Sequence, residues 1–165
     1  MILMTLFACT KGDAGDSGTD SGAVGGDEAA AALWAEIDGY DSWGQDDVWA
    51  GIQPSSDGTH GDFVQIWGND AAIGSTGDAT AAEGSILVKQ GYNDDAGADP
   101  KSNLTVIWKS ADYGGDDGWF WGNYGADGSV NVAGASGDDA VGGCTGCHSS
   151  GSDARRYVTD TPGGE

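Results

Sequence analysis

Short apolar runs separated by turn-forming residues constrain the fold of this chain more than any other feature of its sequence. The runs combine β-branched and aromatic residues, as strands do, and cover residues 63–67, 85–89, 104–109 and 119–124. Each run is bounded by Gly, Asp, Asn or Pro, which are the residues that form hairpin turns. Because strands joined by short connections pair with their sequence neighbours, the pattern predicts an antiparallel sheet.

The segments around these runs predict one further strand and few helices. Residues 126–128, Ala-Asp-Gly, are expected to form a tight turn from which residues 130–132 return. Residues 28–37 contain strong helix formers with apolar side chains at helical spacing, and Gly39 is expected to end that helix. The chain is therefore predicted to have an α+β fold, mainly an antiparallel β-sheet with a few helices.

Both ends of the chain are expected to lie outside the folded domain. Residues 1–9 are apolar and end in Leu-Phe-Ala-Cys, which resembles a bacterial lipobox and predicts a lipoprotein signal segment ending at the lipidated Cys9. An ordinary hydrophobic start with an incidental cysteine is the alternative. Residues 10–30, rich in Gly, Ser, Asp and Ala, predict a flexible acidic tether. The domain is then expected over residues 31–158, followed by a disordered tail at 159–165.

The charge of the chain narrows its range of partners. It has 27 acidic and 6 basic residues, for a net charge of −21. Nucleic acid is excluded as a partner, because phosphate binding needs clustered Lys and Arg. An anionic membrane surface would repel the domain, so membrane contact is expected only through the lipid anchor. We expect an exported protein, a periplasmic or outer-surface lipoprotein of a bacterium, that would attract a basic redox partner protein.

Cys144, Cys147 and His148 form a C-x-x-C-H motif, which is the attachment signature of c-type haem. Two thiols three positions apart reach the two vinyl groups on one edge of the porphyrin, and the next residue places its imidazole beneath the iron. The motif therefore predicts one covalently attached haem c, with His148 as an axial iron ligand. Export agrees with this prediction, because c-type haem is attached outside the bacterial cytoplasm.

Other roles for the two cysteines compete with haem attachment. Cys144, Cys147 and His148 could bind zinc if His60 supplied the fourth ligand. A thioredoxin-like redox pair needs a βαβ setting, which the predicted strands do not provide. A structural disulfide is permitted in an exported protein. Haem is preferred because the complete C-x-x-C-H motif is the most specific of these patterns.

The order of these features resembles the cytochrome P-460 family, which includes the related cytochromes c′-beta. The similarity is carried by the segments GSILVKQGY, LTVIWK, GDDGWFWGNY and the late GGCTGCHSS, and it covers residues 33–158. The motif follows several strands instead of an N-terminal helix, unlike that of the all-helical cytochromes c. The resemblance implies a mainly antiparallel sheet, a homodimer, and a haem held by Cys144 and Cys147 with His148 as proximal ligand.

The same resemblance leaves two activities open. In the P-460 branch a lysine is crosslinked to the porphyrin rim, and the protein oxidises hydroxylamine; the matching residue here is Lys89, with Lys109 as the substitute candidate. The c′-beta branch lacks the crosslink and binds nitric oxide or similar small gases. The resemblance thus implies either an enzyme that oxidises hydroxylamine or a related small nitrogen compound, or a gas-binding protein without turnover. By itself, a lysine at a strand end is usually solvated.

No motif identifies the residue on the distal side of the haem. Glu83 precedes Lys89 but falls in a predicted turn, and a lone histidine such as His60 is more often structural than catalytic. A simple electron carrier, the third alternative, usually places Met or His opposite the proximal His. The methionines, Met1 and Met4, lie in the leader, so a carrier would depend on His60. An open distal iron site is therefore expected.

Overall fold

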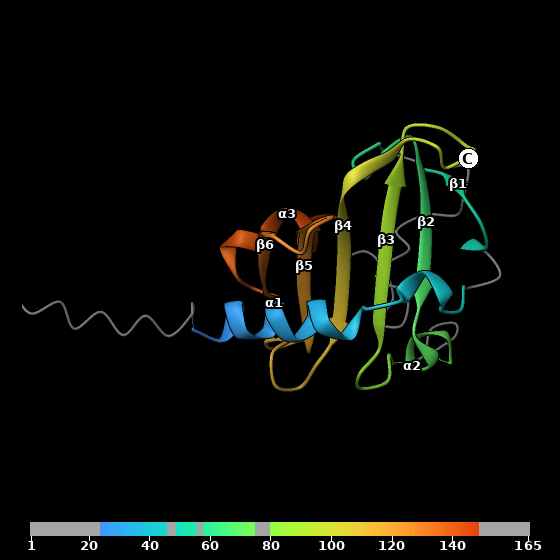
Figure 1. The fold of residues 1–165 in the computed structure, drawn as a ribbon. Coiled ribbons are helices and arrows are strands. Elements are labelled where there is room, and N and C mark those ends of the chain that lie inside the picture. The colour runs from blue at the N-terminus through green and yellow to red at the C-terminus, as the bar shows by residue number, and fades with distance from the viewer. Residues whose placement is uncertain (1–23, 46–48, 56–57, 75–79, 149–165) are drawn as a thin grey trace, which may run out of the picture.

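The computed structural model describes residues 24–45, 49–55, 58–74 and 80–148. Its centre is a six-stranded antiparallel sheet in which the strand order follows the chain (Figure 1). The strands are β1 (Gln53–Pro54), β2 (Phe63–Gly68), β3 (Ile86–Tyr92), β4 (Pro100–Lys109), β5 (Trp119–Gly125) and β6 (Val130–Ala135). The predicted α+β fold is confirmed, and each predicted strand is present.

Short helical segments flank the sheet. They are α1 (Val24–Glu36), η1 (Tyr40–Ser42), α2 (Asp70–Ile73), η3 (Asp139–Val141) and α3 (Gly142–His148). In Figure 1, α1 crosses in front of the sheet and α3 lies behind it. Within the described ranges, none of these helices has the length and apolar character needed to cross a membrane.

One face of the sheet packs against α1. Alternate strand residues point to this face, as the two-residue period of a strand requires. The buried residues shared by α1, the turn after it and this face are Ala29, Ala30, Leu33, Ile37, Ile86, Val88, Leu104, Val106, Phe120 and Tyr124. The Tyr124 hydroxyl donates a hydrogen bond of 3.0 Å to the carbonyl oxygen of Ala30, which ties β5 to the helix backbone.

The opposite face of the sheet carries a second core. Its buried members on the strands are Val64, Ile66, Leu87, Ile107, Trp119 and Trp121. Val141 of η3 is fully buried in this core, and Cys144 of α3 packs against it. The two cores together place α1 and α3 on opposite faces, so that the C-x-x-C-H motif lies over the sheet.

The structure moves one predicted boundary. Helix α1 begins at Val24, earlier than the predicted start at residue 28, and Ala29 and Ala30 are completely buried. The last part of the range 10–30 therefore belongs to the folded domain and not to a tether, because alanine methyl groups pack closely against the sheet. The predicted turn at 126–128 is present, closed by a hydrogen bond from Gly125 N to Ser129 O of 2.7 Å.

Several predictions fall on residues that the structure does not describe. The signal segment 1–9 with Cys9 and most of the tether lie outside the described residues. The same is true of residues 149–158 at the end of the predicted domain and of the tail 159–165. These assignments stay predictions.

Candidate haem site

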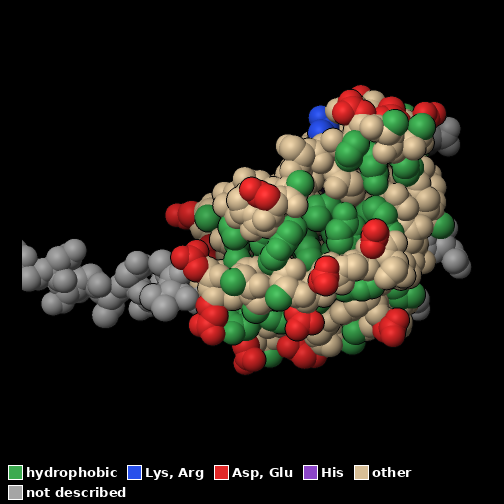
Figure 2. All heavy atoms as spheres, viewed as in Figure 1, with side chains coloured by type: hydrophobic (Ala, Val, Ile, Leu, Met, Phe, Trp, Pro, Cys, Tyr) green, Lys and Arg blue, Asp and Glu red, His purple; other side chains and the backbone are tan. Residues whose placement is uncertain are grey.

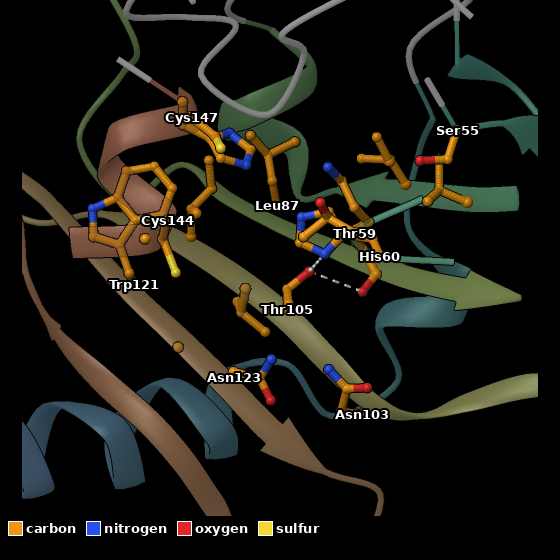
Figure 3. A pocket seen from close by; sticks show the side chains of 18 of the residues that line it. Ser55, Thr59, His60, Leu87, Asn103, Thr105, Trp121, Asn123, Cys144 and Cys147 are labelled. Atoms are coloured by element: carbon orange, nitrogen blue, oxygen red, sulfur yellow. Dashed lines mark hydrogen bonds between the residues drawn. The ribbon is translucent and has the colours of Figure 1, made fainter. Parts of the chain in front are cut away.

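A cavity of about 340 Å³ lies between the sheet and α3 (Figure 3). Ligand pockets in proteins typically enclose about 300–1,000 Å³. The described residues that line it come from the segments before β2, from β2 to β5 and from α3: Trp49, Ser55, Thr59, His60, Val64, Ile66, Leu87, Lys89, Asn103, Thr105, Val106, Ile107, Trp121, Gly122, Asn123, Gly143, Cys144, Cys147 and His148.

The floor of the cavity has an apolar half and a polar half, because strand register brings similar side chains into rows. Ile107 pairs with Leu87 on one side and Trp121 on the other, which gives an apolar row. Two residues further along each strand, Thr105 pairs with Lys89 and with Asn123, which gives a polar row. Directly opposite residues in antiparallel strands share a face, so both rows point into the cavity.

Helix α3 forms the wall that carries the predicted haem ligands. Its sequence, GGCTGCH, contains three glycines and has low helix propensity, so tertiary packing through the buried Val141 must hold it in place. His148 is only 9% exposed, and its ring meets that of Trp121 edge-on at a centroid distance of 5.2 Å. The imidazole is therefore held against the apolar half of the floor.

The environment of the cysteines argues against the alternatives to haem. Burial raises the pKa of the Cys144 thiol, with a smaller contribution from Cys147. An activated redox cysteine has a lowered pKa, so the shift is opposite to that of a thioredoxin-like pair. The two sulfur atoms are not joined in a disulfide. Among the described residues, no three His, Cys, Asp or Glu side chains come close enough together to hold a metal ion.

The structure separates the two candidate lysines. Lys89 of β3 lines the cavity on the floor. Lys109 lies elsewhere: its ammonium donates to the carbonyl oxygen of Asp117 at 2.7 Å and stands 5.2 Å from the centre of the Trp119 ring. Lys109 is therefore engaged in holding the β4–β5 connection, and Lys89 is the lysine that a ligand in the cavity would meet.

His60 stands on the opposite side of the cavity from α3 (Figure 3). It belongs to the turn between β1 and β2, and its ring centroid lies 6.3 Å from that of His148. The Nδ1 atom of His60 is 3.5 Å from the hydroxyl oxygen of Thr105. The sequence left the position of this histidine open, and the structure brings it to the predicted haem ligand.

Glu83 is not part of the site. It lies in a turn, as predicted, and its Oε1 accepts a hydrogen bond of 2.8 Å from the backbone N–H of Ala111. The described residues that line the cavity include no Asp or Glu at all. A carboxylate that moves protons is therefore absent from the part of the lining that the structure describes.

Three other residues of the cavity lining, Thr105, Asn123 and Trp49, were not predicted as site residues from the sequence. Thr105 and Asn123 each sit two positions from an apolar residue of the same strand face, and this polar break in an otherwise apolar row is a signal that could have found them. Trp49 gave no such signal. Its indole N–H is buried and has no hydrogen-bond partner among the described residues, although it lines the cavity.

These features fit a haem. A flat macrocycle needs apolar and aromatic walls, which Leu87, Ile107 and Trp121 provide, and an axial nitrogen ligand, which His148 provides. Trp49 also lines the cavity, so its buried N–H, which has no partner among the described residues, could donate to a polar group of a ligand there. Cys144, Cys147 and His148 would hold the group.

The fold and the site together define a haem-protein domain built on an antiparallel sheet. In a comparison with family models, the Cytochrome P460 model matches residues 38–159. The chain belongs to the cytochrome P460 family, as the resemblance indicated, and the family implies a haem cofactor. A search of curated proteins found no significant match.

Proposed function

We propose that this protein is an exported cytochrome with one haem attached covalently to Cys144 and Cys147, and that it oxidises hydroxylamine or a related small nitrogen compound. His148 is the proximal iron ligand, and Lys89 is the residue that crosslinks to the porphyrin rim. The proposal combines membership of the Cytochrome P460 family with the positions of these four side chains around one cavity.

The proposal depends mainly on the position of Lys89 in the same cavity as the C-x-x-C-H motif. The two lie far apart in sequence, on β3 and α3, yet both line the same cavity. Lys109, the other candidate, is held at Asp117 instead. A lysine on the floor beneath a haem is in a position to reach the rim, whereas a solvated strand-end lysine is not.

The chemistry divides between the haem and the chain. A bound haem supplies an iron that accepts electrons one at a time. Loss of two electrons and two protons converts hydroxylamine, NH₂OH, into nitroxyl, HNO; the two electrons are passed on to a redox partner protein, and the two protons are released to solvent. The chain's part is to exclude water with its apolar floor and to hold a small polar substrate near Thr105 and Asn123, whose side chains can hydrogen-bond to N–H and O–H groups.

The electron acceptor is a basic redox protein in this proposal. A chain with a net charge of −21 attracts a positively charged partner and speeds its association at low salt. Figure 2 shows Asp and Glu side chains spread over the face that carries α1, with little Lys or Arg between them. This face is opposite to the one that bears the cavity, so it illustrates the acidic surface of the domain and is not itself the proposed contact with the partner. Export and lipidation at Cys9 would place the encounter outside the cytoplasm, and a homodimer is expected from the family.

One observation favours a second function, the binding of nitric oxide or a similar small gas without turnover. The described lining contains no carboxylate to take protons from a substrate, and half of the floor is apolar. Binding a gas needs no proton transfer, so such a lining suffices for it. The presence or absence of the Lys89 crosslink separates the two functions.

Mass spectrometry of the mature protein, expressed with its haem-attachment machinery, tests the proposal. We expect one added haem mass on the peptide that contains Cys144 and Cys147, and for the enzyme a second peptide, containing Lys89, linked to the same haem. The crosslinked form should show a red-shifted ferrous spectrum and hydroxylamine turnover. A haem without the Lys89 link, with tight nitric oxide binding and no turnover, would instead support the gas binder. A polypeptide without haem mass would refute both.

A further inference from the structure

We infer that His60 is the second axial ligand of the haem iron, opposite His148. This inference rests on the proposed attachment of haem through the C-x-x-C-H motif. It changes the expectation of an open distal site: in the resting protein the sixth iron position is taken by a side chain of the same chain, and a small molecule must displace it.

The first observation is the distance between the two histidines. Their ring centroids are 6.3 Å apart, one ring on α3 and the other on the turn before β2. A metal–imidazole nitrogen bond is about 2 Å long, so the centres of two imidazoles that bind one ion from opposite sides are roughly 6 Å apart. The separation fits one iron between the two rings and leaves no space for a further ligand.

The second observation is that the backbone holds His60 at this place. The carbonyl oxygen of His60 lies so close to Gly91 of β3 that a Cβ at position 91 would overlap it. Gly61 has a φ of +127°, and a Cβ there would stand 2.7 Å from the carbonyl oxygen of Tyr92. Both glycines let the turn settle directly on β3, and this contact fixes the distance of His60 from the cavity floor.

The third observation concerns the tautomer of His60. The hydroxyl of Thr105 lies 3.4 Å from the carbonyl oxygen of Lys89, to which it can donate. The hydroxyl oxygen of Thr105 also lies 3.5 Å from Nδ1 of His60. When the hydroxyl proton points to the Lys89 carbonyl, the hydroxyl oxygen is free to accept from His60, and Nδ1 is then the nitrogen that carries the proton. Nε2 is then the nitrogen with a lone pair, and a metal-binding histidine is commonly oriented by such a contact on its other nitrogen.

Two imidazole ligands give a six-coordinate, low-spin iron, which differs from the five-coordinate, high-spin iron of an open site. His60 and a small nitrogen compound or gas would therefore compete for the same iron position. A small nitrogen compound or gas reaches the iron only when His60 leaves, so its observed binding rate is reduced by the fraction of time for which His60 is bound. Removing His60 should raise that rate, even where the affinity of the cavity for the small molecule is unchanged.

The test is the optical and electron paramagnetic resonance spectrum of the ferric holoprotein, compared with those of His60→Ala and Thr105→Val. We expect a low-spin spectrum in the wild type and a high-spin spectrum in His60→Ala, with low spin restored by added imidazole. Thr105→Val keeps the ligand and should stay largely low-spin. Nitric oxide should bind ferrous His60→Ala at least about tenfold faster than wild type, which corresponds to about 1.4 kcal/mol.

Haem content measured on the same samples separates this inference from the proposed function. If wild type carries haem but is high-spin, or if His60→Ala remains low-spin, His60 is not the ligand while haem attachment stands. Persistence of low spin in His60→Ala and its loss in Lys89→Met would assign the position to Lys89 and overturn the inference. His60→Met, which supplies a thioether ligand in the same place, guards against misfolding of the alanine variant, because its low-spin spectrum requires a folded site.

Discussion

Lys89 and Thr105 stand directly opposite each other on β3 and β4, and both line the cavity that α3 covers. The Thr105 hydroxyl reaches the carbonyl oxygen of Lys89 at 3.4 Å and Nδ1 of His60 at 3.5 Å. One threonine thus connects the lysine proposed to crosslink with the histidine proposed to bind iron. These polar residues of the floor contact one another, so the effects of substituting them are not expected to be additive.

Replacing Lys89 by Met removes the amine but keeps an unbranched apolar side chain. We expect the haem to remain attached through the cysteines, the Lys89–haem peptide to disappear from the mass spectrum, and hydroxylamine turnover to fall about tenfold or more, or about 1.4 kcal/mol in barrier. Lys109→Met is the control: it breaks the contact with Asp117 and should lower stability slightly while leaving the haem spectrum unchanged. Equal turnover in wild type and Lys89→Met would remove Lys89 from the mechanism.

The strands β2 to β6 were predictable because the local sequence of each shows an apolar run or alternation bounded by turn residues. Residues such as Phe63 to Trp67 alternate or run apolar between turn residues, and neighbouring strands pair in sequence order. Strand β1 was not predictable, since Gln53 and Pro54 carry no pattern and pair only because β2 offers an edge. Helix α3 was missed because its glycines oppose helix formation, and the packing of Val141 overrides that propensity.

The site was predictable where a motif fixes local chemistry and not where the fold brings distant residues together. The C-x-x-C-H motif identifies Cys144, Cys147 and His148 without any structure. The family resemblance had selected Lys89 and kept Lys109 as the substitute, and the structure adds that Lys89 lines the cavity whereas Lys109 is held at Asp117. His60 could not be placed at all, since its approach to His148 depends on how one turn packs on another strand.

Replacing Gly91 by Ala tests whether the turn that carries His60 is held by β3. A Cβ at this position would overlap the His60 carbonyl oxygen, so the turn must move. We expect a loss of about 1–3 kcal/mol in the free energy of unfolding, measured by denaturant titration, and a partial change of the ferric spectrum toward high spin. Gly26→Ala in α1, where a Cβ has no neighbour within 4 Å, should instead stabilise by about 0.5–1 kcal/mol. Tolerance of Ala at position 91 would contradict the packing described.

Replacing Trp49 by Phe tests whether its buried N–H serves the ligand. If the indole donates to a carboxylate of the haem, the variant should lose about 1.5–3 kcal/mol more stability in the haem-bound protein than in a haem-free Cys144→Ala/Cys147→Ala background. The control is Tyr124→Phe, because the Tyr124 hydroxyl donates to the Ala30 carbonyl oxygen at 3.0 Å on the other face of the sheet, and that hydrogen bond is lost equally in both backgrounds. Equal losses for Trp49→Phe in the two backgrounds would show that its N–H does not contact the haem.

Stability should fall at alkaline pH, and Tyr124 should account for part of the fall. Burial raises the pKa of the Tyr124 hydroxyl, which also donates to the Ala30 carbonyl oxygen in its neutral form. A raised folded-state pKa means that the stabilising contribution is complete below the unfolded value of about 10 and is lost as the pH rises above it.

Tyr124→Phe should cost about 0.5–1.5 kcal/mol at pH 7. Above about pH 10, its unfolding free energy should then fall less steeply than that of the wild type. The pKa values of Tyr40 and Tyr92 are also raised, mainly by burial, but both tyrosines are present in wild type and variant, so their contributions cancel in the comparison. Denaturant titrations from pH 7 to 11.5 would measure the two slopes, and parallel slopes would mean that Tyr124 ionises as readily in the folded chain as in the unfolded one.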